Sequence, residues 1–359
     1  MSRRSALKDK CLTNSDIAEL LASEAETATQ PLQKALRRAS RKAFLWPEEA
    51  AQLIHQERSL EELPGVGPYL SKLIRRWIEH PPLVPLTPEI RKDFLTILQA
   101  RSVLSKSSAW LSGLKGDLQM HTQWSDGSGT IAEMADMAQQ RNYEYIAITD
   151  HSKGLKIAGG IDEKALRKQA VEIAKANRSI PRSGKTVTVL SSIELNLNPR
   201  GEGDMDPKAL AKLDLVLGSF HSVLRVKHDQ TARYLAALRN PDIQILGHPR
   251  GRIYNYRLGL KADWPRVFAE AAKRDKAVEI DCYPDRQDLN VTLLKLARAA
   301  GTRVSLGTDA HHPWQLEFIE LGLAAALKAK IPAKRIVNFM PLADLKTWVA
   351  KVRRKARQR

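Results

Sequence analysis

The chain has 359 residues and a formal net charge of +18, and 43% of its residues are hydrophobic. This length allows two domains, or one large barrel with a small module, while no apolar run approaches the roughly 20 residues that cross a bilayer. The N-terminal segment MSRRSALKDK lacks a following apolar signal core, and two cysteines cannot form a disulfide framework. We therefore expect a cytoplasmic globular protein without membrane attachment. The positive charge favours a polyanionic partner, of which nucleic acid is the commonest.

Residues 11–110 show helical periodicity and contain no strand-like run. Apolar positions recur at spacings of three and four along the segments 14–26 and 31–46, and a third helical stretch follows over 59–80. The proline-rich segment 80–90 breaks that stretch and indicates a joint. We predict an all-α domain over residues 1–110.

The motif L-P-G-V-G at residues 63–67 lies inside this helical region. A tight glycine turn followed by a helix leaves free backbone N–H groups at the helix start, and such groups can hold a phosphate oxygen. Glycine is needed there because the backbone itself must approach the ligand. The alternative is an αα-hairpin whose glycine turn serves only packing. The DNA-binding residues predicted from this motif are Gly65, Gly67, Lys72, Arg75 and Arg76.

From Lys115 onward, hydrophobic runs alternate with amphipathic helices, and seven of these runs each end in a His, Asp or Glu. Repeated strand–helix units predict a parallel sheet, and seven units with one shared functional end suggest a closed, TIM-like barrel. We predict this α/β domain over residues 115–345. The runs are 117–122, 145–151, 187–194, 213–221, 243–248, 278–282 and 303–311.

The polar residues at these strand ends are histidines and carboxylates. Gathered at one end of a parallel sheet, such side chains are the ligands that a cluster of divalent metals needs. We therefore predict a metal site. Its candidate ligands are His121, Asp126, His151, Glu194, His221, His248, Asp309 and His311.

Two further groups of basic residues bear on phosphate binding. Lys153, Arg252 and Arg286 follow strand ends and either neutralise a phosphate or are surface cations. Residues 346–359 carry seven basic residues and no acid. We interpret this segment as a basic C-terminal tail, which is either a solvated helix end or an arm that contacts phosphates.

Several of these segments together resemble the PHP domain, named after polymerase and histidinol phosphatase. They include M-H-T-x-W-S-D-G (120–127), I-T-D-H-S (148–152), I-L-G-H-P-R-G-R (245–252) and G-T-D-A-H (307–311). The resemblance covers roughly residues 115–325 and is closest to the C-terminal PHP domain of bacterial X-family DNA polymerases. The L-P-G-V-G segment resembles the helix-hairpin-helix of DNA repair proteins and of those polymerases. Between the two regions we expect no polymerase core.

The resemblance implies a metal-dependent phosphoesterase with a distorted seven-stranded barrel and two or three divalent ions, either Zn, Mn or Fe. It implies that Glu194 bridges metals, that His151 or Asp309 also handles a proton, and that Arg252 acts on the phosphate. The family usually opens with H-x-H on the first strand, whereas this chain has Gln119 before His121. Because an amide is a weaker ligand than an imidazole, the first metal should bind less tightly here.

Three functions fit these observations. The first is a phosphoesterase that acts on DNA, as a 3′–5′ exonuclease or a 3′-end processing enzyme, and the basic charge and the L-P-G-V-G motif favour it. The second is a small-molecule phosphatase of the histidinol-phosphatase type. The third is a non-catalytic DNA-binding protein with a degenerate PHP site, which the change at Gln119 allows.

Overall fold

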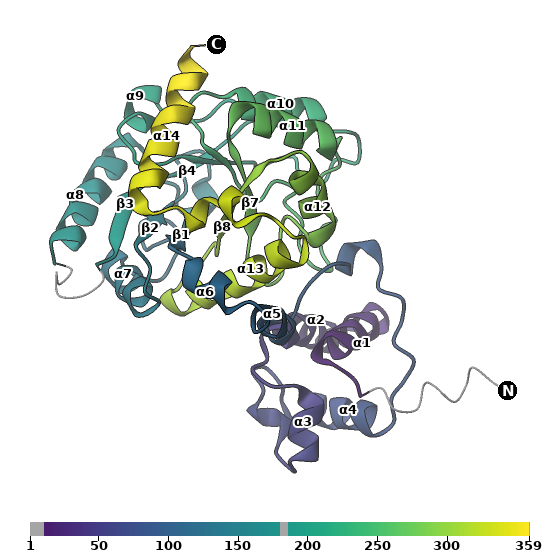
Figure 1. The fold of residues 1–359 in the computed structure, drawn as a ribbon. Coiled ribbons are helices and arrows are strands. Elements are labelled where there is room, and N and C mark those ends of the chain that lie inside the picture. The colour runs from purple at the N-terminus through teal and green to yellow at the C-terminus, as the bar shows by residue number, and fades with distance from the viewer. Residues whose placement is uncertain (1–10, 180–185, 359) are drawn as a thin grey trace.

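The computed structural model describes residues 11–179 and 186–358. The chain begins with a group of helices that lie to one side of the remainder (Figure 1). The first of them starts with a capping box, in which the Thr13 side chain accepts a hydrogen bond from the Asp16 backbone while the Asp16 carboxylate accepts one from Thr13. The group comprises α1 (Asn14–Thr27), α2 (Leu32–Lys42), α3 (Ala50–His55) and α4 (Pro68–Glu79). The next two helices, α5 (Ile97–Leu104) and α6 (Ser108–Gly113), pack against the α/β part, and Ile97, Ala100 and Leu104 belong to its hydrophobic core.

Eight strand segments follow in the described residues, and they form two parallel sheets. The first sheet has the order β1 (Gly116–Asp117), β2 (Tyr145–Ile148) and β3 (Thr188–Ser191). The second has the order β4 (Glu194–Asn196), β5 (Leu217–Ser219), β6 (Ile245–Leu246), β7 (Ala277–Asp281) and β8 (Arg303–Gly307). The third predicted strand is therefore divided into β3 and β4, which only Ser192 and Ile193 separate.

Backbone hydrogen bonds join the two sheets on both sides. Leu118 N donates to Leu306 O at 3.3 Å, and His121 N donates to Ala310 O at 2.7 Å, which links the end of β1 to that of β8. Ser152 N donates to Glu194 O at 3.1 Å, which links the end of β2 to β4. The carboxyl ends of strands from both sheets consequently lie near one another, as the predicted site requires.

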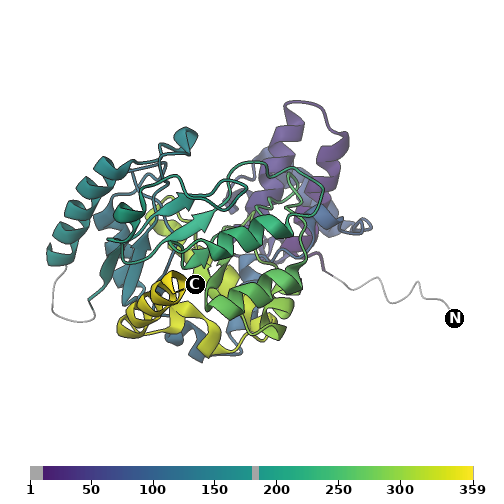
Figure 2. The same cartoon turned by 90° about the horizontal axis from the view of Figure 1, so that it is seen from above.

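Helices surround the sheets (Figures 1 and 2). They are α7 (Ile131–Gln140), α8 (Glu163–Ser179), α9 (Pro207–Leu210), α10 (Thr231–Arg239), α11 (Trp264–Arg274), α12 (Val291–Ala299), α13 (Ile319–Lys328) and α14 (Leu342–Arg357). None of the helices in the described ranges has the length and apolar character that spanning a bilayer requires.

The predicted basic tail is largely helical. Its residues up to Arg357 belong to α14, and residue 359 lies outside the described residues. Trp348, Val349 and Val352 are buried on one face of this helix and pack in a cluster with Tyr145 and other strand residues. The amphipathic spacing of these apolar residues explains why the segment is a packed helix and not a free arm.

The N-terminal segment contacts two loops of the α/β part, one after β6 and one after β7. The Tyr254 ring packs edge-on against Phe44 and Phe94, with centroid distances of 4.8 and 5.1 Å. The Gln287 side chain exchanges two hydrogen bonds of 2.8 Å with the backbone of Leu95. Because both loops begin at strand ends, the N-terminal segment helps to fix the surroundings of the predicted site.

A buried lysine outside the site supports a prediction about pH. Lys276 is 1% exposed, and its Nζ donates to the Asn240 carbonyl. Burial, assisted by Arg274 and opposed by Asp242 and Glu270, lowers the pKa of Lys276 to about 7. The unfolded chain keeps a lysine pKa of about 10.4, so between these values the unfolded state holds one more proton and stability rises with pH.

We therefore expect the free energy of unfolding to contain a contribution from Lys276 that rises by up to about 1.4 kcal/mol per pH unit between pH 7 and 10. Urea denaturation of wild type and Lys276→Met across this window measures it. Lys273→Met, at an exposed position near the end of α11, is the control. An equal pH dependence in wild type and Lys276→Met would show that the lysine is charged in the folded protein.

Candidate metal centre

The strand ends bring the predicted histidines and carboxylates into one network. His121 follows β1, His151 follows β2, and Glu194 opens β4. His221 and His248 follow β5 and β6, while Asp309 and His311 follow β8. Parallel strands present their carboxyl ends at the same edge, which explains why residues far apart in the sequence meet here.

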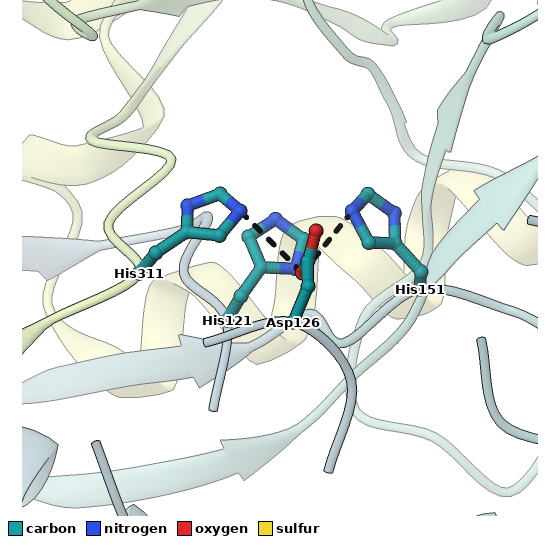
Figure 3. A group of neighbouring side chains, drawn as sticks. All are labelled: His121, Asp126, His151 and His311. Carbon is teal, nitrogen blue, oxygen red and sulfur yellow. Dashed lines mark ion pairs between the residues drawn. The ribbon is translucent and has the colours of Figure 1, made fainter. Parts of the chain in front are cut away.

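One group of side chains surrounds the Asp126 carboxylate. Its Oδ1 lies 3.4 Å from His311 Nε2, 3.6 Å from His151 Nε2 and 3.9 Å from His121 Nδ1. Figure 3 shows the three rings directed toward this carboxylate. These four residues place one ligand atom each within 4.8 Å of one another, so they can hold a metal ion.

A second group surrounds Glu194. Its Oε2 lies 2.9 Å from His151 Nδ1, and its Oε1 lies 2.7 Å from His248 Nε2 and 3.2 Å from His221 Nε2. His151 therefore takes part in both groups, one through each ring nitrogen. Asp309 adds a contact of 2.9 Å between its Oδ1 and His121 Nε2.

Charges in this centre act strongly on one another. Although burial opposes ionisation of Glu194, the neighbouring His151, His221 and His248 hold the pKa of its carboxyl well below the usual value. Burial also disfavours a charged His151, but Glu194 and Asp126 raise the pKa of this residue to about 10. Burial lowers the pKa of His121, with His151 and His311 acting in the same direction. The protein thus keeps a carboxylate ionised in its interior.

Several buried atoms of the centre lie at ion-pair distance from one another but form no hydrogen bond of normal geometry within the described residues, and they include both ring nitrogens of His121, His151 Nδ1, Glu194 Oε2, His221 Nε2 and Asp309 Oδ2. Leaving so many buried polar atoms unpaired is costly unless another group binds them. Imidazole nitrogens and carboxylate oxygens in this arrangement fit divalent cations such as zinc or manganese.

Other groups orient the candidate ligands. Asn196 Oδ1 lies 3.1 Å from His221 Nδ1, and the Asp309 carbonyl lies 2.7 Å from His311 Nδ1. Such bonds leave the opposite ring nitrogen free for a metal. Asp150 accepts hydrogen bonds from the backbone and hydroxyl of Thr122 and from Ser125, which hold the loop that carries Asp126.

A cavity of about 260 Å³ opens in front of these side chains. Its lining includes the candidate ligands His151, His221, His248, Asp309 and His311, together with the basic residues Arg257 and Arg286. A hollow with imidazoles, carboxylates and guanidinium groups suits an anionic ligand held beside metal ions.

Comparison with known proteins identifies the family. Residues 117–275 match the PHP domain. The DNA polymerase/3′-5′ exonuclease PolX of Bacillus subtilis is 34% identical over 269 residues, or 75% of this chain and 46% of that protein. Probable phosphatase PBPRB2022 of Photobacterium profundum is 30% identical over 219 residues, or 58% of this chain and 82% of that protein. The chain belongs to the PHP family.

This PHP chain spans about half the length of the Bacillus subtilis relative. Probable phosphatase YcdX of Escherichia coli is 27% identical over 236 residues, or 63% of this chain and 90% of that protein. Among solved structures, the histidinol phosphate phosphatase of Lactococcus lactis, complexed with zinc, L-histidinol and phosphate, matches with a TM-score of 0.43 and 16% identity. That match covers 60% of this chain and 93% of the other.

Gln119 contacts Glu279, a carboxylate that was not among the residues predicted from the sequence. Gln119 and Glu279 are both fully buried, and with its amide nitrogen turned toward Glu279, Gln119 donates at 2.6 and 2.8 Å to the two carboxylate oxygens. Glu279 also accepts a hydrogen bond of 2.7 Å from His248 N. The signal that could have revealed Glu279 is its alternation with Asp281 along β7, which places both on one face.

We expect Gln119→His to raise the metal content of the protein, or to lower the Mn²⁺ concentration needed for activity, with a change in affinity of roughly 10-fold or more. The reason is that an imidazole at this position restores a nitrogen donor beside His121. Metal analysis and Mn²⁺ titration measure the effect, and Gln119→Asn is the control without a new nitrogen ligand. Unchanged values in both measurements would mean that the Gln119–Glu279 pair has replaced the first metal site.

The three predicted phosphate-binding cations are not equivalent. Arg286 borders the cavity and contacts the Asp309 carboxylate, with Asp281 at 3.7 Å. Lys153 instead forms an exposed ion pair of 2.8 Å with Glu163 and is not among the residues around the cavity.

Arg252 also borders the cavity, but its side chain is held by backbone carbonyl groups. Its guanidinium donates hydrogen bonds to the carbonyl groups of Lys92, Asp93, Arg286 and Gln287, and its carbon Cζ lies 3.9 Å from the centroid of the Phe94 ring. Burial lowers the pKa of Arg252 to about 10. Because the backbone engages these donors, we expect Arg252 to position the loop at the edge of the cavity, and its predicted role in phosphate binding stays a prediction.

The residues of the L-P-G-V-G motif lie in the helical group and do not border the cavity at the metal centre. Gly65 has a φ of +81°, which explains the need for glycine there, and Gly67 is the N-cap of α4. Lys72, Arg75 and Arg76 are exposed on α4, where Arg75 faces Glu79 at 3.8 Å.

Proposed function

We propose that this protein is a metal-dependent phosphoesterase that acts on DNA, as a 3′–5′ exonuclease or a 3′-end processing enzyme. The observation that carries the proposal is the pair of histidine–carboxylate groups that share His151 and face a cavity bordered by Arg257 and Arg286. We also propose that the two sheets form one distorted barrel, in which β3 and β4 act as a single bent strand.

Two or three divalent ions, of Zn, Mn or Fe, would be held by His121, Asp126, His151, Glu194, His221, His248, Asp309 and His311. When bound, such ions polarise phosphate oxygens and make water a better nucleophile at neutral pH. Arg286 neutralises charge on the phosphate, since it borders the cavity. Asp309, which reaches the same cavity, accepts a proton from the attacking water.

DNA is favoured as the substrate by charge and by the helical group. The chain has a net charge of +18, and the exposed Lys72, Arg75 and Arg76 lie on the helix that follows Gly67. We propose that this region is a helix-hairpin-helix that contacts phosphates through backbone amides and these cations. The Bacillus subtilis relative, whose name includes a 3′-5′ exonuclease, supports the same substrate.

A small-molecule phosphatase is the second candidate. It is favoured by the relative from Photobacterium profundum, a probable phosphatase of which the chain covers 82%. A cavity of about 260 Å³ is also compatible with a small phosphomonoester.

Purified full-length protein, loaded with Mn²⁺ or Zn²⁺, should be tested side by side on labelled single-stranded DNA and on a generic phosphomonoester. We expect shortening of the DNA from its 3′ end. We also expect sequence-independent DNA binding that weakens with salt, with a log–log slope of about −0.7 for each phosphate contacted. Hydrolysis of the phosphomonoester alone, with salt-independent or absent DNA binding, would favour the second candidate.

A further inference from the structure

A second hollow adjoins the cavity at the metal centre. It has a volume of about 520 Å³ and is bordered by Arg41, Tyr256, Tyr283 and Asp285. It shares Ile253, Arg286 and His311 with the first cavity. A ligand bound at the metal centre can therefore extend past Arg286 and His311 toward α2, which carries Arg41.

Tyr256 lies at the tip of a hairpin that is anchored on both sides. Backbone hydrogen bonds of 2.8 and 2.9 Å join Ile253 and Arg257, and Tyr254 is buried against Phe44 and Phe94. The next residue, Asn255, accepts a hydrogen bond of 3.0 Å from the buried Arg91. Despite these anchors the Tyr256 side chain is 57% exposed. The backbone thus presents an aromatic ring to solvent at a fixed place beside the second hollow.

Guanidinium groups accompany this ring. Arg225 Cζ lies 4.6 Å from the centroid of the Tyr256 ring, and Arg257 follows directly in the hairpin. Arg41, which is 48% exposed, lies across the hollow and faces Asp285 at 3.8 Å. Exposed aromatic rings beside arginines are the combination that binds single-stranded nucleic acid, because bases stack on the rings while cations contact phosphates.

The second hollow also leads toward the L-P-G-V-G motif. Arg41 borders the hollow, and the adjacent Lys42 packs over Gly65, where an added Cβ would lie 2.5 Å from Lys42 Cδ. The end of α2 therefore connects the hollow to the proposed helix-hairpin-helix. A small ester would occupy only the cavity at the metal centre, whereas a polynucleotide would follow this whole route.

We propose that Tyr256, with Arg225, forms a base-stacking subsite for a nucleotide next to the scissile phosphate of a single-stranded nucleic acid. This inference rests on the proposed function, since it assigns a place to the strand that enters the metal centre. The ring stacks on any base, so the subsite favours single strands without reading their sequence.

Binding of a short fluorescent oligothymidylate to the full-length protein, followed by anisotropy in EDTA, tests the subsite. The ligands are the intact oligonucleotide and versions with one abasic residue at successive positions near the 3′ end. We expect one abasic position to weaken binding by the wild type roughly 5- to 100-fold. Tyr256→Ala should weaken binding of the intact oligonucleotide to a similar extent and should show no further loss with that abasic version. Tyr256→Phe, which keeps the ring, should bind like the wild type.

Independent losses from Tyr256→Ala and from every abasic position would overturn the subsite, and so would wild-type binding that is absent or indifferent to abasic residues. The proposed function fails differently, namely if the metal-loaded wild type hydrolyses no DNA. If the losses from Tyr256→Ala and from the abasic residue simply add, while the wild type still hydrolyses DNA, only the subsite is rejected. If Tyr256→Ala removes the effect of one abasic position but the metal-loaded wild type hydrolyses no DNA, the subsite is supported and the proposed DNA phosphoesterase activity is rejected.

Discussion

The Glu194→Gln variant should retain little bound metal and should hydrolyse phosphoesters at least about 100-fold more slowly than the wild type. Glu194 is fully buried, and its two oxygens lie within 3.2 Å of nitrogens of His151, His221 and His248. Glutamine keeps the shape but offers one neutral oxygen and an amide that donates hydrogen bonds. It cannot supply the negative charge and two acceptor atoms that bring metal ions and histidines together.

Metal analysis of protein purified without added metal, together with initial hydrolysis rates at saturating Mn²⁺, measures both effects. Glu202→Gln is the matched control, because Glu202 is exposed and pairs with Arg200 and Asn198 away from the centre. Circular dichroism of both variants checks folding. A Glu194→Gln protein with wild-type metal content and rate would show that this carboxylate is not a ligand.

That the candidate ligands lie close together could be predicted from the sequence, because a single repeated pattern determines it. Each hydrophobic run ends in a polar residue, and parallel strands bring such ends to one edge. The structure accordingly places His121, His151 and Glu194 in one network, although β3 and β4 divide the third run. That division depends on which neighbour each half pairs with, and a single run of apolar residues does not carry this information.

The contacts of Arg252 and of Glu279 could not be predicted from the pattern of strand ends. Arg252 follows a strand end in a G-H-P-R-G-R segment, which suggests phosphate binding, yet its partners Lys92 and Asp93 lie about 160 residues earlier. Glu279 sits within a hydrophobic run, and its contact with Gln119 requires both sheets to be in place. Long-range contacts of this kind depend on how elements pack, and local patterns do not encode them.

The same packing connects the N-terminal helices to the hairpin beside the site, and a buried ion pair tests this connection. The Arg91 side chain is 4% exposed and donates at 2.8 Å to Glu19, whose side chain is 6% exposed. It also donates to Glu26 at 2.6 Å and to Asn255 of the hairpin at 3.0 Å. Arg91→Leu leaves the Glu19 charge buried without a partner, so we expect the free energy of unfolding to fall by about 3–5 kcal/mol.

Urea denaturation of four proteins measures this effect: the wild type, Arg91→Leu, Glu19→Leu and the double variant. The double variant should regain much of the loss, because no uncompensated charge then remains buried. Arg58→Leu is the matched control, since Arg58 pairs with Glu48 and Glu62 at the surface and should cost about 1 kcal/mol or less. DNA hydrolysis should also fall in Arg91→Leu and stay low in the double variant, because both lack the hydrogen bond to Asn255 that holds the Tyr256 hairpin. Full activity in the double variant would mean that the hairpin keeps its place without the hydrogen bond from Arg91 to Asn255.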